Sequence, residues 1–237
     1  MKESTAIRTS GLTKKYNEKT AVDHLDLTIR EGELFALLGV NGAGKTTTIR
    51  MLSCLSSPTE GTAEVFGHEV SQEPDTVKSL IGISTQDTAV AEKLTVEENL
   101  RFMAEIYGKT RESADRIIQD FGLDEVRRKR AKTLSGGWKR RLSIAMALIG
   151  EPKVLFLDEP TLGMDVLARR ELWKIIEELK GKTTIILTTH YMEEAEALSD
   201  RIGVMINGRL VALGTLAELE EKTGKKGLEE VFISLAE

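Results

Sequence analysis

The pattern of apolar and polar residues changes character twice along the chain. Residues 20–30 alternate between apolar and polar positions, as in a strand with one buried face. Residues 34–38 form a short continuous apolar run, which is typical of a strand buried on both faces of a parallel sheet. This run leads into a glycine-rich loop and a predicted helix over 45–54, and further short strands are predicted at 62–66 and 80–85.

The middle of the chain, residues 87–150, is predicted to be mostly helical. Thr95 lies three positions before Glu98, which is the spacing of a capping box, and apolar residues then recur at helical intervals as far as position 107. Two more helices are expected over 110–121 and 135–148.

The last third returns to alternating strands and helices. Apolar strands are predicted over 153–160 and 183–190, and they are followed by helices over 171–180 and 191–198. A later pair of short apolar runs flanks an Asn-Gly dipeptide at positions 207 and 208, which predicts a β-hairpin.

The order of these elements predicts a fold class. The charged tail, residues 215–237, is expected to be helical. Strands and helices that alternate on either side of a helical block indicate an α/β core with a helical insertion.

Composition narrows the class of protein. The 237 residues are 41% hydrophobic and 30% charged, with a net charge of −5. This globular, acidic composition argues against a general nucleic-acid-binding protein. The one cysteine, Cys54, excludes an internal disulfide and argues against a cysteine-rich metal site. No apolar run reaches the roughly 18 residues of a membrane helix, so we expect a cytosolic protein.

The glycine-rich loop fits the phosphate-binding pattern G-x-x-x-x-G-K-[ST]. Its backbone N–H groups and the following helix N-terminus would bind phosphate oxygens. Lys45 would contact the β- and γ-phosphates, and the Thr46 hydroxyl would bind Mg²⁺. The candidate nucleotide-binding residues of this loop are Gly39, Val40, Asn41, Gly42, Ala43, Gly44, Lys45, Thr46 and Thr47.

Two carboxylates follow the apolar strand over 154–157. A buried parallel strand delivers its carboxyl end to the ligand crevice, so Asp158 would hold Mg²⁺ through water and Glu159 would orient or deprotonate the attacking water. Many strands end in acids. The pairing with a phosphate-binding loop is what makes this segment a Walker B candidate.

A third motif, Leu-Ser-Gly-Gly at positions 134–137, precedes a predicted helix. Ser135 could be a helix N-cap, and a capped helix N-terminus with two bare glycines is also an anion site, so both interpretations can hold together. The surrounding segment, 126–141, has eight Lys or Arg and no acid. It is either a nucleic-acid patch or a solvated face that favours ATP, and the lack of interleaved aromatics beyond Trp138 favours the second.

Taken in order, these motifs resemble the nucleotide-binding subunit of an ABC transporter over nearly the whole chain. The resemblance rests on the phosphate-binding loop, Gln86 after a strand, LSGG, VLFLDEP, the turn from Thr161 to Asp165, and His190 at a strand end. It implies a P-loop NTPase (RecA-like) core with an N-terminal antiparallel β subdomain and an α-helical insertion. The expected parts of this single ABC ATPase domain are a nucleotide-binding α/β core (1–86 and 151–214), a helical subdomain with the signature loop (87–150) and a helical tail (215–237).

The resemblance also implies roles for individual residues. Tyr16 would stack on adenine, Asp165 would connect the two sites of a dimer, and the signature loop would contact the γ-phosphate bound by the other protomer. The implied catalytic residues are Lys45, Gln86, Glu159 and His190, the implied metal contacts are Thr46, Gln86 and Asp158, and the further nucleotide contacts are Tyr16, Ser135, Gly136 and Gly137. Considered singly, Tyr16 could be a half-buried core aromatic, Gln86 a loop residue and His190 a helix cap.

Three segments narrow the resemblance to cassettes of the ABC-2 exporter group, which includes drug-, antibiotic- and sodium-extruding systems and the lipid-exporting A subfamily. They are SGGWKRRLSIAMAL, DVLARRELWKIIEELK and LEEVFISLAE. The resemblance implies ATP and Mg²⁺ as cofactors, a separate integral-membrane permease, a second cassette and no nucleic acid. It also implies a cytoplasmic location on the inner face of the cell membrane.

Two alternatives remain open at this point. The chain could be a soluble ABC ATPase that serves assembly or nucleic-acid remodelling, although it has one cassette, no long coiled coil and no extra domain. It could also be a regulatory module without turnover, against which the intact Lys45, Asp158, Glu159 and His190 argue. Two positions depart from the usual family pattern, namely Trp138 in place of Gln after LSGG and Thr85 in place of the frequent Pro.

The departure at Trp138 can be tested against its neighbour Ser135. If Trp138 only replaces the usual Gln at the edge of the signature, Trp138→Gln leaves nucleotide binding by the monomer unchanged and alters turnover by no more than about tenfold. Ser135→Arg should abolish turnover with monomer binding intact, because a bulky cation blocks the path of the other protomer's γ-phosphate. Steady-state ATPase assays and nucleotide titrations of both variants check this. Lost activity in Trp138→Gln with a near-normal Ser135→Arg would contradict it.

Overall fold

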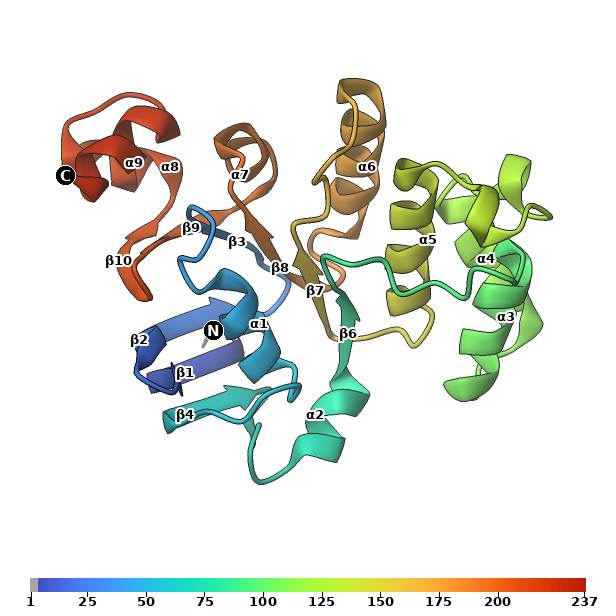
Figure 1. The fold of residues 1–237 in the computed structure, drawn as a ribbon, viewed down its shortest axis with the longest axis horizontal. Helices are drawn as coiled ribbons and strands as arrows, with labels where there is room; N and C mark the ends of the chain where they lie inside the picture. The colour runs from blue at the N-terminus through green and yellow to red at the C-terminus, as the bar shows by residue number, and fades with distance from the viewer. Residues whose placement is uncertain (1–3) are drawn as a thin grey trace.

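A six-stranded sheet forms the centre of the molecule (Figure 1). The computed structural model describes residues 4–237, so residues 1–3 of the expected 1–86 segment lie outside the described range. The strand order is β10-β9-β3-β8-β7-β6. The strands are β3 (Leu34–Leu38), β6 (Ile81–Ser84), β7 (Val154–Asp158), β8 (Thr184–Thr189), β9 (Arg201–Ile206) and β10 (Arg209–Gly214). All pairs are parallel except β9 and β10, which form the predicted hairpin.

A smaller antiparallel sheet, in the order β2-β1-β4-β5, packs beside it. Its strands are β1 (Thr5–Tyr16), β2 (Lys19–Arg30), β4 (Glu60–Val65) and β5 (His68–Glu69). Strand β1 was not predicted from the sequence, although it has 12 residues. The register of β1 shifts at several bulges, and Gly11 adopts a positive φ of 57°, so the alternation that marks a strand is broken.

Nine α-helices lie within the described residues, 4–237. They are α1 (Lys45–Leu52), α2 (Pro74–Leu80), α3 (Val96–Ile106), α4 (Arg111–Asp120), α5 (Gly136–Leu148), α6 (Val166–Leu179), α7 (Met192–Leu198), α8 (Leu216–Thr223) and α9 (Leu228–Ala236). Helix α2 was not predicted, because it buries only Val77 and has no apolar stripe. Helix α3 begins with the predicted capping box of Thr95 and Glu98.

Helix α6 begins at Val166, five residues before the predicted start at 171. The reason is a local cap. The Asp165 carboxylate accepts hydrogen bonds from the backbone N–H groups of Leu167 and Ala168, each at 3.0 Å. The turn from Thr161 to Asp165, one of the family motifs, therefore also ends in the N-cap residue of this helix.

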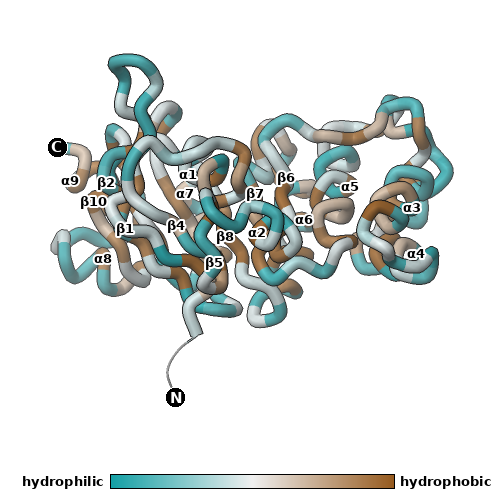
Figure 2. The backbone as a smooth tube through the Cα atoms, turned by 90° about the horizontal axis from the view of Figure 1, so that it is seen from below, coloured by the Kyte–Doolittle hydropathy of each residue, from teal (hydrophilic) through white to brown (hydrophobic). Residues whose placement is uncertain are grey.

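The two faces of the central sheet bury different partners. Along β7, Leu155 and Leu157 pack with α5 and α6, whereas Val154 and Phe156 pack with α1 and the small sheet. This alternation explains the continuous apolar run at 154–157, because both faces are covered. Helices α3, α4 and α5 lie at one end of the molecule, and α8 and α9 lie at the other (Figures 1 and 2).

The strand order determines where the polar motifs meet. Because β3, β8, β7 and β6 are parallel neighbours, their carboxyl ends lie along the same edge of the sheet. The segments that follow these strands contain the glycine-rich loop, His190, Glu159 and Gln86 respectively. Four segments that are far apart in the sequence are thus side by side at a single edge, where parallel sheets bind ligands.

Candidate active site

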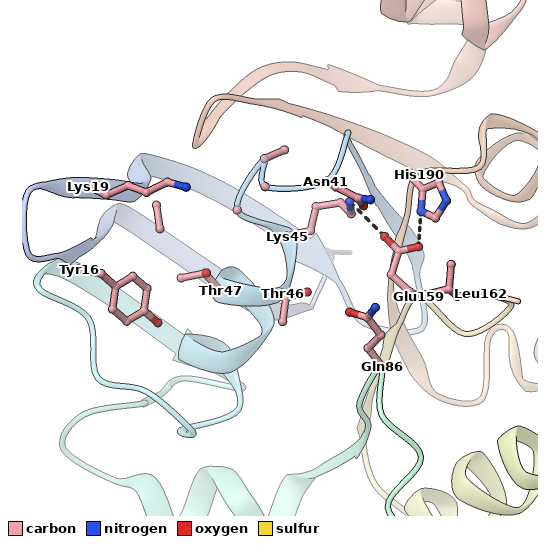
Figure 3. A pocket seen from close by; sticks show the side chains of 14 residues that line it. Tyr16, Lys19, Asn41, Lys45, Thr46, Thr47, Gln86, Glu159, Leu162 and His190 are labelled. Carbon is pink, nitrogen blue, oxygen red and sulfur yellow. Dashed lines mark hydrogen bonds and ion pairs between the residues drawn. The ribbon is translucent and has the colours of Figure 1, made fainter.

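A pocket with a volume of ≈ 470 Å³ opens at this edge (Figure 3). It brings together most of the residues predicted from the sequence. The predicted residues that line it are Tyr16, Asn41, Gly42, Ala43, Gly44, Lys45, Thr46, Thr47, Gln86, Glu159 and His190. Lys19, Ala21 and Leu162 complete the lining, and the sequence analysis did not select them.

The loop before α1 is wound so tightly that two of its positions require glycine. Gly44, at the N-cap of α1, has a φ of 105°, and a Cβ atom there would lie 2.4 Å from the carbonyl oxygen of Ala21. A Cβ atom on Gly39 would lie 2.4 Å from the carbonyl oxygen of Met205. The loop therefore packs closely against the neighbouring backbone. The first N–H groups of α1 are left at the pocket, where an anion can accept their hydrogen bonds.

The hairpin turn between β9 and β10 joins this loop to the small sheet. The Gly208 N–H donates to the Ala43 carbonyl at 3.0 Å, and the Asp23 N–H of β2 donates to the Gly208 carbonyl at 2.8 Å. The Arg209 guanidinium pairs with the Asp23 carboxylate at 2.6 Å. The pocket is therefore formed by residues of both sheets, and the turn at Gly208 tethers the two sheets to each other.

Lys45 and His190 hold the Glu159 carboxylate between them (Figure 3). The Lys45 ammonium is buried, and it lies 3.1 Å from Glu159 Oε1 while donating to the Gly39 carbonyl at 2.6 Å. The second carboxylate oxygen, Oε2, lies 2.7 Å from His190 Nδ1. Both oxygens of Glu159 are engaged, so the side chain has a defined orientation at the pocket wall.

Hydroxyl groups surround the other carboxylate. Asp158 Oδ1 accepts hydrogen bonds from Thr46 Oγ1 at 3.1 Å and from Thr188 Oγ1 at 2.5 Å. The same Thr188 oxygen accepts the Glu159 N–H at 3.1 Å. Hydroxyl and carboxylate oxygens are the ligands that Mg²⁺ prefers, so the donor set of Thr46 and Asp158 fits this ion.

Tyr16 lies at the rim of the pocket, on β1, and is 45% exposed. The Lys14 ammonium lies 5.2 Å from the centre of its ring. The alternative that Tyr16 is a core aromatic is therefore wrong. An exposed aromatic face beside Lys19 and Ala21 offers a flat surface for a nucleobase.

The signature loop lies outside this pocket. Ser135 occupies the N-cap position of α5, but its side chain makes no capping hydrogen bond, and both Ser135 and Gly136 are exposed. Gly137 is partly buried and Trp138 packs against the helical core, where the Arg141 guanidinium lies 4.9 Å from the ring centre. The Ser135 hydroxyl is thus free for another partner, whereas Trp138 has a packing role.

Thr188 is a site residue that sequence reasoning missed. It is fully buried and bonds both to Asp158 and to the Glu159 backbone. The available signal was weak: two threonines at the carboxyl end of a strand, just before His190.

Residues 22–162 match the family model described as ABC transporter. The chain belongs to this family. It is 48% identical over 228 residues to the daunorubicin/doxorubicin resistance ATP-binding protein DrrA of Streptomyces peucetius, a match that covers 94% of this chain and 69% of the relative. It is 42% identical over 211 residues to the phospholipid-transporting ATPase ABCA3 of Homo sapiens, which covers 87% of this chain and 12% of that protein.

A solved ATP-binding subunit of an ABC transporter has the same fold. It superposes with a TM-score of 0.89 at 30% sequence identity, covering 98% of this chain and 100% of the other. The predicted fold class, the resemblance to the exporter cassettes and the activity as an ATPase are therefore confirmed. The alternative of a soluble assembly factor is not favoured by these relatives. No helix within residues 4–237 of the cassette combines the length and the apolarity needed to cross a membrane.

The contacts of Lys45 and His190 predict different defects when each is replaced by alanine. Lys45→Ala should abolish both ATP binding and turnover, because Lys45 is expected to contact the ground-state phosphates and because Glu159 would lose its buried counter-ion. His190→Ala should still bind ATP but hydrolyse it slowly, because the Glu159 carboxylate loses the group that orients it. Equilibrium nucleotide binding and steady-state phosphate release separate the two. Equal and normal turnover in both variants would refute the assignment.

Proposed function

We propose that this cassette hydrolyses Mg²⁺-ATP and thereby drives export through a separate membrane permease. The observation that carries the proposal is the Glu159 carboxylate, held between Lys45 and His190 at the edge where the phosphate-binding loop, Asp158 and Gln86 converge. A carboxylate in that position can take the proton of a water that attacks a γ-phosphate.

The residues that the sequence predicted for this site each have a proposed part in hydrolysis. Tyr16 stacks on the base, and the loop from Gly39 to Thr47 and the Lys45 ammonium bind the phosphates. Thr46, Asp158 and Gln86 would hold Mg²⁺, which would supply positive charge to offset that of the phosphates. A γ-phosphate competes with Glu159 for the Lys45 ammonium, so ATP binding releases one oxygen of the carboxylate to act as a base. His190 keeps the other oxygen in place.

The surface around the pocket supports a second cassette as partner. Leu162, at the pocket rim, and Val166 and Leu167, at the start of α6, are 44%, 57% and 75% exposed. Such a group of exposed apolar side chains next to a functional site is typical of an interaction surface. Gly137 packs within the same chain against α6, so the exposed Ser135 loop lies beside this surface. We therefore place the P-loop of one cassette opposite Ser135, Gly136 and Gly137 of the other, with ATP between them and Asp165 connecting the two sites.

A second groove, of ≈ 450 Å³, supports a permease as the other partner. It lies between the central sheet and the helical part, next to Thr85, which precedes Gln86. Its apolar lining residues are Leu55, Ile81, Ile83, Ala89, Met103, Tyr107, Met146 and Ala147. We propose that a short amphipathic helix from a cytoplasmic loop of the permease docks here. The cassette would then lie at the inner face of the cell membrane. A movement of Gln86 would displace the docked helix of the permease.

The cargo in this proposal is bound by the permease and not by the cassette. The names of the relatives refer to daunorubicin and doxorubicin in one case and to phospholipids in another. Daunorubicin, doxorubicin and phospholipids each have a large apolar part. We propose that this exporter carries a molecule of that kind.

The dimer can be tested with the substitution Glu159→Gln. This change keeps the ATP site but removes the base, so the ATP-bound dimer should persist. Light scattering should show monomers without nucleotide and dimers with Mg²⁺ and saturating ATP. Wild-type protein that hydrolyses its ATP serves as the control. A monomeric Glu159→Gln protein under saturating ATP would count against the shared site.

The permease groove can be tested with a charge placed on its exposed edge. Leu55 is 55% exposed and lines the groove, so Leu55→Glu should prevent co-purification of a polytopic membrane protein from detergent-solubilised membranes of the native host. ATP hydrolysis by the isolated cassette should stay within about twofold, because Leu55 does not line the nucleotide pocket. Ile233→Glu, at an equally apolar and 45% exposed position on α9, is the matched control. Equal co-purification with both variants would exclude this groove as the docking site.

A further inference from the structure

Arg140, on helix α5, is an arginine buried in the core, with only 5% of its surface exposed. Arginine is rarely buried to this extent without a carboxylate partner. The hydrogen bonds of this guanidinium instead go to main-chain carbonyl oxygens. No part of the pocket chemistry described above uses this residue.

The guanidinium joins two segments of the candidate active site. Its Nε donates to the Pro160 carbonyl at 2.9 Å, and its Nη2 donates to the carbonyls of Asp158 and Glu159 at 2.5 and 2.6 Å. Its Nη1 donates to the carbonyl of Gln86 at 3.3 Å and also to that of Thr85. A planar fork with five N–H donors can satisfy such a set of acceptors, whereas a lysine ammonium cannot.

The backbone that Arg140 holds is in an uncommon conformation. Glu159 has a φ of 49°, in the left-handed region that residues other than glycine rarely adopt. Its carbonyl and that of Pro160 lie just beyond the end of β7, where the ladder of strand hydrogen bonds stops. Such a conformation persists only when its surroundings fix it, and Arg140 supplies three of the fixing hydrogen bonds.

The charge of Arg140 suits this position. Burial lowers the pKa of its guanidinium to about 10, while Asp158, Glu194, Glu159 and Asp87 act in the opposite direction. The group thus stays cationic at neutral pH. Burial raises the pKa of Glu194, which is one of these carboxyls.

We propose that Arg140 is a positioning residue for ATP hydrolysis, which fixes the Glu159 carboxylate and the Gln86 loop as one unit with the signature helix α5. This inference rests on the proposed role of Glu159 as the base. Arg140 begins the second turn of the helix that Ser135 opens. A displacement of α5, and with it of Ser135, is therefore transmitted through one guanidinium to both the base and Gln86.

Replacing Arg140 should therefore affect ATP binding and ATP turnover differently. None of its hydrogen-bond partners is a side chain of the pocket, and Lys45 and Tyr16 have their own separate contacts. Ground-state ATP binding should therefore be preserved when the fork is lost, whereas kcat should fall because the base is no longer held at the attacking water.

The first experiment compares Arg140→Lys and Arg140→Gln with the control Lys109→Gln. Lys109 pairs with Glu151 at the surface and lies outside the basic segment 126–141, so its loss removes an equal charge without touching the buried fork. In both Arg140 variants we expect kcat to fall at least tenfold, with the ATP dissociation constant and binding stoichiometry within about threefold of wild type. Lys109→Gln should stay within about twofold in both quantities.

The second experiment is a double-mutant cycle with Glu159→Gln, read by single-turnover hydrolysis of labelled ATP. Because Arg140 acts through both Glu159 and Gln86, the loss of rate caused by Arg140→Lys should be at least about threefold smaller in the Glu159→Gln protein than in the wild type. A full, additive loss in that background would overturn the proposal, and so would near-normal kcat in both Arg140 variants. Parallel loss of nucleotide binding and turnover in both would make Arg140 a residue of core stability only. Normal turnover in Glu159→Gln alone would instead refute the proposed base itself.

Discussion

Parallel pairing of β3, β8, β7 and β6 is the constraint on which the rest of this molecule depends, because it places four carboxyl strand ends in a row. Each end carries one part of the chemistry, and none of the four segments is close to another in the sequence. The register leaves little freedom: Leu157 pairs with Leu187 and Asp158 with Thr188, so the Asp158 carboxylate meets the Thr188 hydroxyl as a direct result of strand alignment. A shift of one residue would turn these side chains to the other face of the sheet.

The polar cluster at this edge is stabilised only as a complete set. Lys45, Glu159, Asp158 and Arg140 are all buried, and each charge is compensated by an opposite charge or by oriented carbonyl and hydroxyl groups. Breaking a buried pair by removing one partner typically costs about 3–5 kcal/mol, since the remaining charge keeps its desolvation penalty. Such an arrangement contributes little to net stability but orients each group for chemistry at the ligand.

The sequence was informative where a structure depends on interactions between residues that are close together in the chain. The capping box of Thr95, the hairpin at Asn207-Gly208 and the loop around Lys45 were all predicted at their observed places. It was uninformative where an interaction joins distant segments, as Arg140 does, since one more arginine in a basic run looks like a solvated side chain. It also failed where irregularity conceals a pattern, as in the bulged strand β1. The roles of Tyr16, Gln86, Ser135 and His190 depend on the family resemblance, because a lone polar or aromatic residue in one chain carries no local pattern that shows its function.

The tether at Gly208 has a thermodynamic consequence. Because the turn bonds to Ala43 on one side and to Asp23 on the other, the pocket exists only while the two sheets keep their mutual position. A nucleotide that contacts Tyr16 on the small sheet and Lys45 on the central one therefore favours the assembled state over any state in which the sheets separate. By mass action, a ligand present at 100 times its dissociation constant adds about 2.7 kcal/mol to the free energy of unfolding. ATP then stabilises the fold of the cassette as well as serving as its substrate. The free energy of unfolding is lowest when no nucleotide is bound.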